Sequence, residues 1–313
     1  MRILVTGSSG FIGFHLVKYL LKKNTVLGID NNNKYYSEKL KKRRLKLLKK
    51  NKNFTFKKIN ILNKKKLNDI FLKFKPQIVF HLAGQPGVLY SLSNPKSYYT
   101  NNILATKSIS QISLKHKVSK FIFSSSSSVY GEQKKFPIKE TFKTNPKNPY
   151  AKTKLVSEKI IRKTFNKNID YIIFRFFTVY GPFGRPDMFI HKFLNSIKKN
   201  KKIKLYNNGL NYRDFTYVYD VVKILWKAIN VKTKNKTINI CRSSPIKTTD
   251  LVSSIEKIYQ KKGKLTKTGI MKGEMLKTHG SNRILKRNFK NIKFTDIKFG
   301  LKKTVFYFKK YGY

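Results

Sequence analysis

The sequence predicts an α/β fold built on a doubly wound parallel sheet, and two observations carry this prediction. Short apolar runs of β type alternate with segments of helical periodicity through the first half of the chain. A glycine-rich turn joins the first apolar run to the first helical pattern. Alternation of this kind places parallel strands in the middle and helices on both faces. With 313 residues, the chain is long enough for one large domain, or for one domain and a small lobe.

The N-terminal segment has the pattern strand, glycine turn and helix. Residues 2–6 form a short run of β type with Ile3, Leu4 and Val5 as its apolar centre, and apolar residues recur at helical spacing from Leu16 to Leu21. The turn between them has the sequence Gly7-Ser8-Ser9-Gly10-Phe11-Ile12-Gly13. Its glycines let the backbone approach a pyrophosphate, and the free N–H groups at the start of the helix hold the negative charge. We therefore predict that this turn forms a dinucleotide site.

A carboxylate ends the second apolar run, Thr25–Asp30, about twenty residues after the glycines. An acidic side chain at this place accepts hydrogen bonds from the adenosine ribose hydroxyls and repels a 2′-phosphate. Asn31 and Asn32 follow, where a chain that binds NADP more often has Arg. The predicted cofactor is therefore NAD, with Asp30 as a ligand of its ribose.

Four further strands are expected, at Phe54–Ile61, Gln77–Ala83, Phe121–Ser125 and Tyr171–Phe176. Loops at the carboxyl ends of parallel strands carry the ligands in folds of this class. The loops 81–85 and 124–128 belong to this edge, and the first contributes Leu82, Ala83 and Gln85 to the predicted cofactor site. His81 lies within an apolar strand end and is expected to be a buried structural residue.

Three side chains supply the groups that move a proton at an alcohol while a nicotinamide takes the hydride. Tyr150 and Lys154 form a Tyr-x-x-x-Lys pair, which places them one turn apart on one face of a helix. The ammonium is expected to lower the tyrosine pKa from about 10 towards neutrality, so that the phenolate is a usable general base. Ser126, in the serine-rich loop, completes the predicted catalytic set. In a chain rich in lysine this spacing also occurs by chance, so by itself it is a weak signal. It indicates catalysis here because the chain also has a predicted dinucleotide site.

The formal net charge of +56 raises the alternative of a nucleic-acid-binding protein. Its best support is the segment Lys34–Asn53, which is expected to form a helix dense with Lys and Arg. Against it, the excess Lys is spread through every loop and helix, and no recognition motif of Arg and aromatic residues accompanies it. A biased composition, with Lys, Asn, Ile, Phe and Tyr all abundant, is the favoured explanation. Weak, non-specific and salt-sensitive association with polyanions follows from the charge alone.

The remaining composition predicts a cytoplasmic protein without a metal site. Cys241 is the only cysteine, so there is no disulfide framework and a reducing compartment is expected. No apolar run reaches membrane-spanning length, and the first strand begins at residue 2, which leaves no room for a signal peptide. The five histidines show no spacing typical of a metal site.

The whole chain resembles the extended short-chain dehydrogenase/reductase superfamily and, within it, the NAD-dependent nucleotide-sugar epimerases. Its glycine turn has the Gly-x-x-Gly-x-x-Gly spacing typical of that superfamily. The resemblance is greatest to the UDP-glucuronate 4-epimerases. The matching stretches run from one end of the chain to the other, at 7–13, 30–36, 81–88, 94–95, 99–102, 175–182, 184–188 and 213–218.

This resemblance implies an NAD-binding Rossmann domain at 1–178 and a smaller C-terminal α/β lobe at 179–313 that mainly binds a UDP-sugar. Part of the second region, about 212–240, is expected to return to the Rossmann core. A homodimer formed through a helix pair around the helix of Tyr150 is also implied. Near the adenine, Asn60 and Ile61 stand where the family prefers Asp-Ile or Asp-Leu.

In the implied reaction, Tyr150 removes the proton from the sugar O4 while C4 gives its hydride to NAD. The Ser126 hydroxyl forms a hydrogen bond at the same place and so takes part in the transfer of that proton. Lys154 also binds the nicotinamide ribose. The 4-keto sugar turns over in the site and takes the hydride back on its other face, so NAD is not consumed. Arg213 resembles the family arginine that grips the UDP pyrophosphate, a task that suits a bidentate guanidinium.

Four further residues favour a hexuronate as the substrate. Related dehydratases and decarboxylases carry carboxylates just before the Val-Tyr-Gly run, where this chain has Ser127 and Ser128. The hydroxyls of these serines and of Thr178, with the charge of Arg185, are expected to restrain the substrate carboxylate. The alternative is that the hydroxyls only satisfy backbone groups in a tight turn.

The favoured reaction is therefore the 4-epimerisation of UDP-glucuronate to UDP-galacturonate. A UDP-glucose/UDP-galactose 4-epimerase is the nearest alternative, and another nucleotide-sugar epimerase or dehydratase is a further one. An alternative of a different class is a non-catalytic protein that holds NAD and binds a polyanion through its basic surface.

Overall fold

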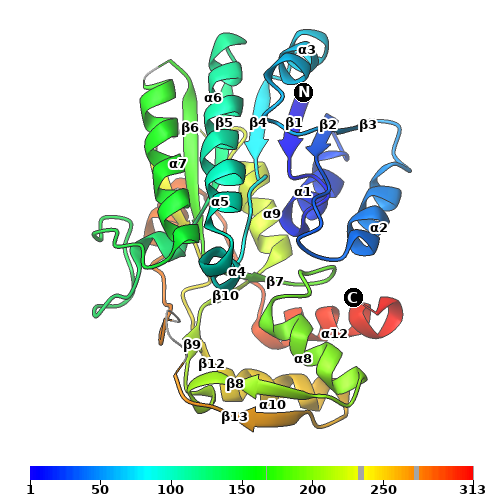
Figure 1. Cartoon of the computed structure of the whole chain (residues 1–313), viewed down its shortest axis with the longest axis vertical. Helices are drawn as coiled ribbons and strands as arrows, with labels where there is room; N and C mark the ends of the chain where they lie inside the picture. The colour runs from blue at the N-terminus through cyan, green and yellow to red at the C-terminus, as the bar shows by residue number, and fades with distance from the viewer. Residues whose placement is uncertain (167, 232–235, 271–274, 313) are drawn as a thin grey trace.

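The computed structural model describes residues 1–312 apart from 167, 232–235 and 271–274, and its centre is a seven-stranded parallel sheet (Figure 1). The strand order is β11-β6-β5-β4-β1-β2-β3. These strands are β1 (Arg2–Thr6), β2 (Thr25–Asp30), β3 (Phe54–Lys58), β4 (Ile78–His81), β5 (Lys120–Ser126), β6 (Asp170–Phe176) and β11 (Lys236–Ile240). Because β1 pairs with both β2 and β4, the strand order reverses beside it, and ligands bind at such a reversal.

Helices cover both faces of this sheet. One face carries α1 (Phe11–Leu20), α2 (Glu38–Leu48) and α9 (Val218–Lys227), and the other carries α3 (Lys64–Phe74), α6 (Ala105–Lys115) and α7 (Pro149–Phe165). Successive residues of β1 point to opposite faces, so Ile3 and Val5 join the first core and Leu4 joins the second. The predicted doubly wound α/β fold is therefore confirmed. Along the described residues, no helix combines the length and the apolar character that crossing a membrane requires.

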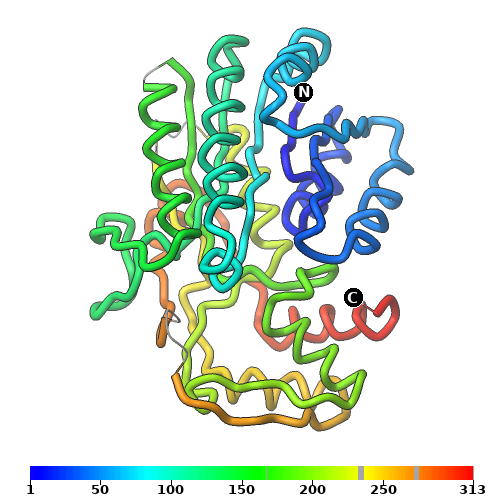
Figure 2. Tube along the Cα trace, viewed as in Figure 1, coloured from blue at the N-terminus to red at the C-terminus, as the bar shows by residue number. Residues whose placement is uncertain are grey.

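The C-terminal half adds a smaller lobe with its own core, which lies below the sheet in Figure 1. Its elements are α8 (Phe189–Lys198), β8 (Lys202–Leu205), α10 (Thr248–Tyr259), β13 (Lys264–Lys267) and α12 (Ile297–Tyr311). Two further short sheets pair β7 (Thr178–Tyr180) with β10 (Phe215–Tyr217), and β9 (Tyr212–Arg213) with β12 (Ile246–Lys247). The trace in Figure 2 returns from this region to the large sheet through α9 and β11, which pairs with β6.

Local side-chain contacts explain where the predicted elements end. β3 is shorter than predicted because the Asn60 side chain accepts a hydrogen bond from a following N–H and turns the chain. The predicted helix 34–53 is α2, which is shorter because the side chain of Ser37 caps its first turn. Lys41 and Arg44 are buried on its inner face, so this helix is not a uniformly basic surface. His81 is fully buried between two threonine hydroxyls, as predicted.

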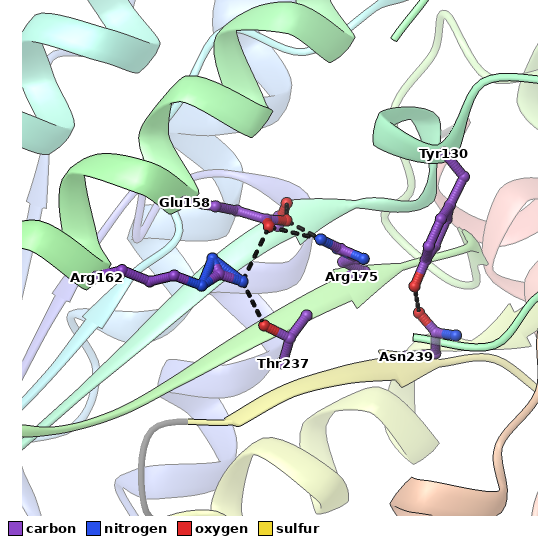
Figure 3. Close-up of polar contacts among 7 residues, drawn as sticks. Tyr130, Glu158, Arg162, Arg175, Thr237 and Asn239 are labelled. Atoms are coloured by element: carbon purple, nitrogen blue, oxygen red, sulfur yellow. Dashed lines mark hydrogen bonds and ion pairs between the residues drawn. The ribbon is translucent and has the colours of Figure 1, made fainter. Parts of the chain in front are cut away.

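A buried polar network fixes α7, which carries the predicted proton-transfer pair, against the sheet (Figure 3). Glu158 of α7 is fully buried and forms a bidentate ion pair with Arg175 of β6, with N–O distances of 2.9 and 2.8 Å. The same carboxylate accepts a hydrogen bond of 2.6 Å from Ser125 Oγ in β5. Arg162, one turn further along α7, donates to the hydroxyl of Thr237 in β11. The helix is thus held by three neighbouring strands.

Removing Glu158 should destabilise the fold, because Arg175 then becomes an uncompensated buried charge. We expect Glu158→Ala to lower the free energy of unfolding by about 3 kcal/mol, measured by urea denaturation. Glu132→Ala removes an exposed carboxylate and is the control, with an expected change below about 0.5 kcal/mol. Equal stability of the two variants would contradict a structural role of the ion pair.

Candidate active site

A cavity of about 390 Å³ lies where the carboxyl ends of the central strands meet the smaller lobe. Every residue that the sequence analysis assigned to the cofactor, to proton transfer or to the sugar lines this cavity. They come from both halves of the chain, from Gly7 in the first turn to Arg213 in β9. The volume is in the range of small-molecule sites.

The glycine turn leaves no room for side chains. Gly7 has a φ of +73°, and a Cβ there would lie 2.7 Å from the backbone nitrogen of Ala83. A Cβ on Gly13 would lie 2.1 Å from the carbonyl oxygen of Gly7. No side chain caps the first turn of α1 after Gly10, so its N–H groups are available to an anion in the cavity. This arrangement fits the pyrophosphate of a dinucleotide.

Asp30, at the end of β2, is tied to the same turn. One carboxylate oxygen accepts a hydrogen bond of 3.2 Å from Ser9 N, and the other accepts one of 2.8 Å from Asn32 N. The residue still lines the cavity, as do Asn60 and Ile61. A fixed carboxylate beside a partly apolar wall fits the ribose and adenine of a dinucleotide.

The predicted proton-transfer residues come together from two elements. Tyr150 and Lys154 lie one turn apart on α7, and Ser126 ends β5. Tyr150 forms a hydrogen bond with Ser126. The Lys154 ammonium donates to the carbonyl oxygen of Ser124 at 2.8 Å. The geometry therefore gives a phenol a proton-sharing partner and a cation on the adjacent turn.

The pKa of Tyr150 differs from the sequence expectation. Burial raises this pKa, and the hydrogen bond with Ser126 and the charge of Arg185 oppose the rise only in part. Burial also lowers the pKa of Lys154 to about 8, with the Glu158 carboxylate acting in the opposite direction. The predicted lowering of the Tyr150 pKa by Lys154 is therefore wrong for this structure, because burial dominates at both groups.

In the serine-rich turn, one hydroxyl forms a hydrogen bond to the backbone of the turn and the others line the cavity. Ser126 Oγ accepts a hydrogen bond of 3.2 Å from Ser128 N and so satisfies a backbone group of the turn itself. Ser127, Ser128 and Thr178 line the cavity. The backbone-satisfying role considered for the hydroxyls of Ser127, Ser128 and Thr178 is carried at this one N–H by Ser126.

Arg185, which lines the cavity, has a carboxylate partner behind it. Its guanidinium forms an ion pair with Asp187. Burial is the largest influence and works against ionisation of that carboxyl, but the Arg185 charge and the hydrogen bonds from Arg185, Tyr35 and the backbone together lower the pKa of Asp187. Asp187 also accepts a hydrogen bond of 3.0 Å from the Tyr35 hydroxyl. Burial, together with the Asp187 charge, raises the pKa of Tyr35 to about 12. Arg213 donates to two main-chain carbonyl oxygens, at 2.9 and 3.2 Å.

Several residues that line the cavity or hold its walls carried no predicted role. Tyr35 and Asp187 lie in stretches that matched by resemblance, but their contact joins positions 152 residues apart in the sequence. Asn102, in the π-helical segment η1 (Tyr99–Leu104), accepts a hydrogen bond of 2.7 Å from Gln85 N and donates to Thr153 of α7 at 3.0 Å. It joins the cofactor loop to the catalytic helix, and π-helical turns are frequent at functional sites. No local pattern in the sequence marks such a turn.

Known proteins are similar to this chain in sequence and in structure along most of its length. The model of the NAD dependent epimerase/dehydratase family matches residues 3–241. The UDP-glucuronate 4-epimerase of Thermodesulfobacterium geofontis is 38% identical over 266 residues, which cover 83% of this chain and 81% of that protein.

Two solved structures have the same architecture. The crystal structure of UDP-glucuronic acid 4-epimerase from Bacillus cereus, in complex with UDP-glucuronic acid and NAD, has a TM-score of 0.94 at 32% identity and 99% coverage of both chains. That of UDP-glucose 4-epimerase from Thermotoga maritima with UDP-glucose has a TM-score of 0.89 at 29% identity, again with 99% coverage of both. Since the family match takes in the glycine turn, Asp30 and the Tyr150–Lys154 pair that line one cavity, the chain belongs to the NAD-dependent epimerase/dehydratase family.

Proposed function

We propose that this chain interconverts UDP-glucuronate and UDP-galacturonate by an NAD-dependent 4-epimerisation. The observation that carries the proposal is one cavity that joins the proton-transfer residues to Ser127, Ser128, Thr178 and Arg185. Their three hydroxyls and one guanidinium suit a sugar carboxylate. The similarity to the Bacillus cereus enzyme, which binds UDP-glucuronic acid and NAD, supports the same substrate class.

The chain's own residues handle the proton of the sugar O4. Tyr150 takes this proton in its phenolate form, which burial opposes and which the hydrogen bond with Ser126 and the charge of Arg185 favour, and later returns it. Lys154, held by the Ser124 carbonyl, carries its positive charge below about pH 8 and is placed to bind the nicotinamide ribose. The glycine turn and Asp30 would hold NAD, which would supply reversible hydride transfer at sugar C4.

The sugar carboxylate needs restraint more than it needs acid catalysis. A 4-keto uronic acid is a β-keto acid and loses carbon dioxide readily. Ser127 and Ser128 can hold the carboxylate by hydrogen bonds, but they cannot act as the acid or base that the related dehydratases place there. Arg185 adds a charge-assisted contact, and Arg213 is assigned to the UDP pyrophosphate.

One observation favours a second candidate, a UDP-glucose/UDP-galactose 4-epimerase. Asp187, which does not itself line the cavity, forms an ion pair with Arg185, and this reduces the positive charge available to a uronate. The fold of UDP-glucose 4-epimerase from Thermotoga maritima is also close to that of this chain. The two candidates differ only in the group on sugar C5, so product analysis separates them.

Purified protein supplied with NAD should convert UDP-glucuronate to UDP-galacturonate and leave UDP-glucose unchanged. Chromatography and proton NMR of the products distinguish the outcomes. If only UDP-glucose reacts and UDP-galactose forms, the substrate is a UDP-hexose and the proposal of a UDP-hexuronate is wrong. Formation of a UDP-pentose would mean decarboxylation and would contradict the role given to Ser127 and Ser128.

Replacing the proposed base tests the mechanism. Tyr150→Phe should lower kcat by roughly 10²–10⁴-fold, because it removes the proton-accepting oxygen and keeps the ring. The dissociation constant for UDP-glucuronate, measured by calorimetry, should stay within about twofold. Tyr259→Phe, in the smaller lobe, is the matched control and should retain the activity of the unmodified protein. A kcat in Tyr150→Phe close to that of this control would remove Tyr150 from the mechanism.

We further propose that residues 1–178 bind NAD and that 179–313 mainly bind the UDP-sugar, with about 212–240 belonging to the Rossmann core. The pairing of β11 with β6 supports this return. A cytoplasmic location is proposed as well, since Cys241 is a buried free thiol. Any nucleic-acid binding is expected to be non-specific.

A homodimer is proposed on the basis of an apolar surface beside α7. Its exposed side chains lie on α4 (Val88–Ser93), η1 and α7, and they are Leu89, Leu92, Tyr99, Leu104 and Val156. Light scattering coupled to gel filtration should give twice the chain mass. The double variant Leu92→Glu/Val156→Glu should be monomeric, because two charges would then be buried in the interface. Leu72→Glu, on the exposed side of α3, should stay dimeric.

A further inference from the structure

Four consecutive carbonyl oxygens directly before Arg185 each accept a hydrogen bond from a buried side chain. Gly181 O accepts from His191 Nε2 at 3.0 Å. Pro182 O accepts from His15 Nε2 at 2.7 Å. The carbonyl oxygens of Phe183 and Gly184 both accept from Arg44 Nη2. An irregular segment is thus fixed residue by residue up to the side chain proposed to hold the sugar carboxylate.

Two of these three donors belong to the dinucleotide-binding half of the molecule. His15 lies on α1, the helix that follows the glycine turn, and burial lowers its pKa to about 3, so the ring is neutral and donates through Nε2–H. Arg44 lies on α2 and is fully buried. Helices on the cofactor side therefore set the position of a loop on the sugar side.

Arg44 also holds the glycine turn itself. Its Nη1 donates to Ser9 O at 2.9 Å and to the Tyr36 hydroxyl at 2.7 Å. Within the described ranges, no carboxylate forms an ion pair with Arg44, and its hydrogen-bond partners are three carbonyl oxygens and one phenol. Burial lowers the pKa of Arg44. A buried cation with only neutral acceptors is costly, and the planar fork of a guanidinium is the group that can reach both segments at once.

The segment after β2 holds Arg185 from its other side as well. Tyr35 donates to Asp187, and Asp187 forms the ion pair with Arg185. A single stretch, from Tyr35 to Arg44, thus contacts both the backbone before Arg185 and the carboxylate that orients its guanidinium.

We infer that Arg44 is a positioning residue that couples the dinucleotide turn to Arg185, so that recognition of the substrate carboxylate depends on the same buried cation as the shape of the cofactor turn. This inference rests on the proposed function, because it takes Arg185 as the partner of the carboxylate. Arg44 does not line the cavity, and so it acts only through its neighbours.

The test compares binding of UDP-glucuronate with binding of UDP by calorimetry, at saturating NAD. Arg44→Lys keeps the charge but cannot span both segments. It should weaken the affinity for UDP-glucuronate by about tenfold, while the affinity for UDP should change by less than about twofold. The affinity for NAD, measured separately, should also fall. Lys46→Met, on the exposed side of the same helix, is the control and should leave all three affinities unchanged.

A second pair of variants keeps the outcomes separate. His15→Phe preserves the aromatic packing but removes the donor to Pro182, so it should lower the affinity for UDP-glucuronate relative to that for UDP even if Arg44→Lys does not fold. Arg185→Gln should lower the same ratio, and adding Arg44→Lys to it should cause little further loss, because both act on one contact. An unchanged ratio in Arg185→Gln would overturn the proposed function of Arg185. A lowered ratio there, with unchanged ratios in Arg44→Lys and His15→Phe, would overturn the coupling.

Discussion

The seating of α7 on the carboxyl edge of the sheet is the constraint on which the rest of the site depends. Spacing alone puts Tyr150 and Lys154 on one helical face. The orientation of α7 about its axis and its position along the sheet depend on contacts with other elements. Glu158 supplies them, since strands β5 and β6 each hold its carboxylate, through Ser125 and Arg175. A buried carboxylate needs such partners to offset its loss of solvation, so the interaction that makes its burial tolerable also places the catalytic side chains.

The basic composition has internal consequences as well as surface ones. The chain has 70 Lys and Arg but only 14 Asp and Glu, so buried cations often meet carbonyl oxygens in place of carboxylates. Lys120 donates to three carbonyl oxygens near the end of α9, in addition to its contact with Asp170. Arg44 relies on neutral acceptors in the same way. These contacts tie distant segments together, which explains part of the excess charge without any polyanion partner.

The cofactor region and the sugar region are therefore held by shared interactions, since single buried side chains contact both. Ser9 of the glycine turn and the carbonyl groups before Arg185 share one guanidinium. Asn102 similarly links the cofactor loop at Gln85 to the catalytic helix. Because each of these groups is buried and polar, its loss would leave unsatisfied partners on both sides of the cavity.

By itself, the sequence determined the doubly wound sheet, the glycine turn with Asp30 at the end of β2, and the residue types that line the cavity. The sheet and the glycine turn follow from periodicity and short spacings, which local chemistry fixes. The sugar-side residues of the cavity were expected only from the resemblance to a known family. Only the tertiary structure decided the pKa of Tyr150 and the pairing of Arg185 with Asp187. It also decided that Lys41 and Arg44 are buried, on a helix whose basic composition suggests that it is exposed to solvent. Burial and contacts between residues far apart in the chain set these properties, because the loss of water around a charged group depends on everything packed against it.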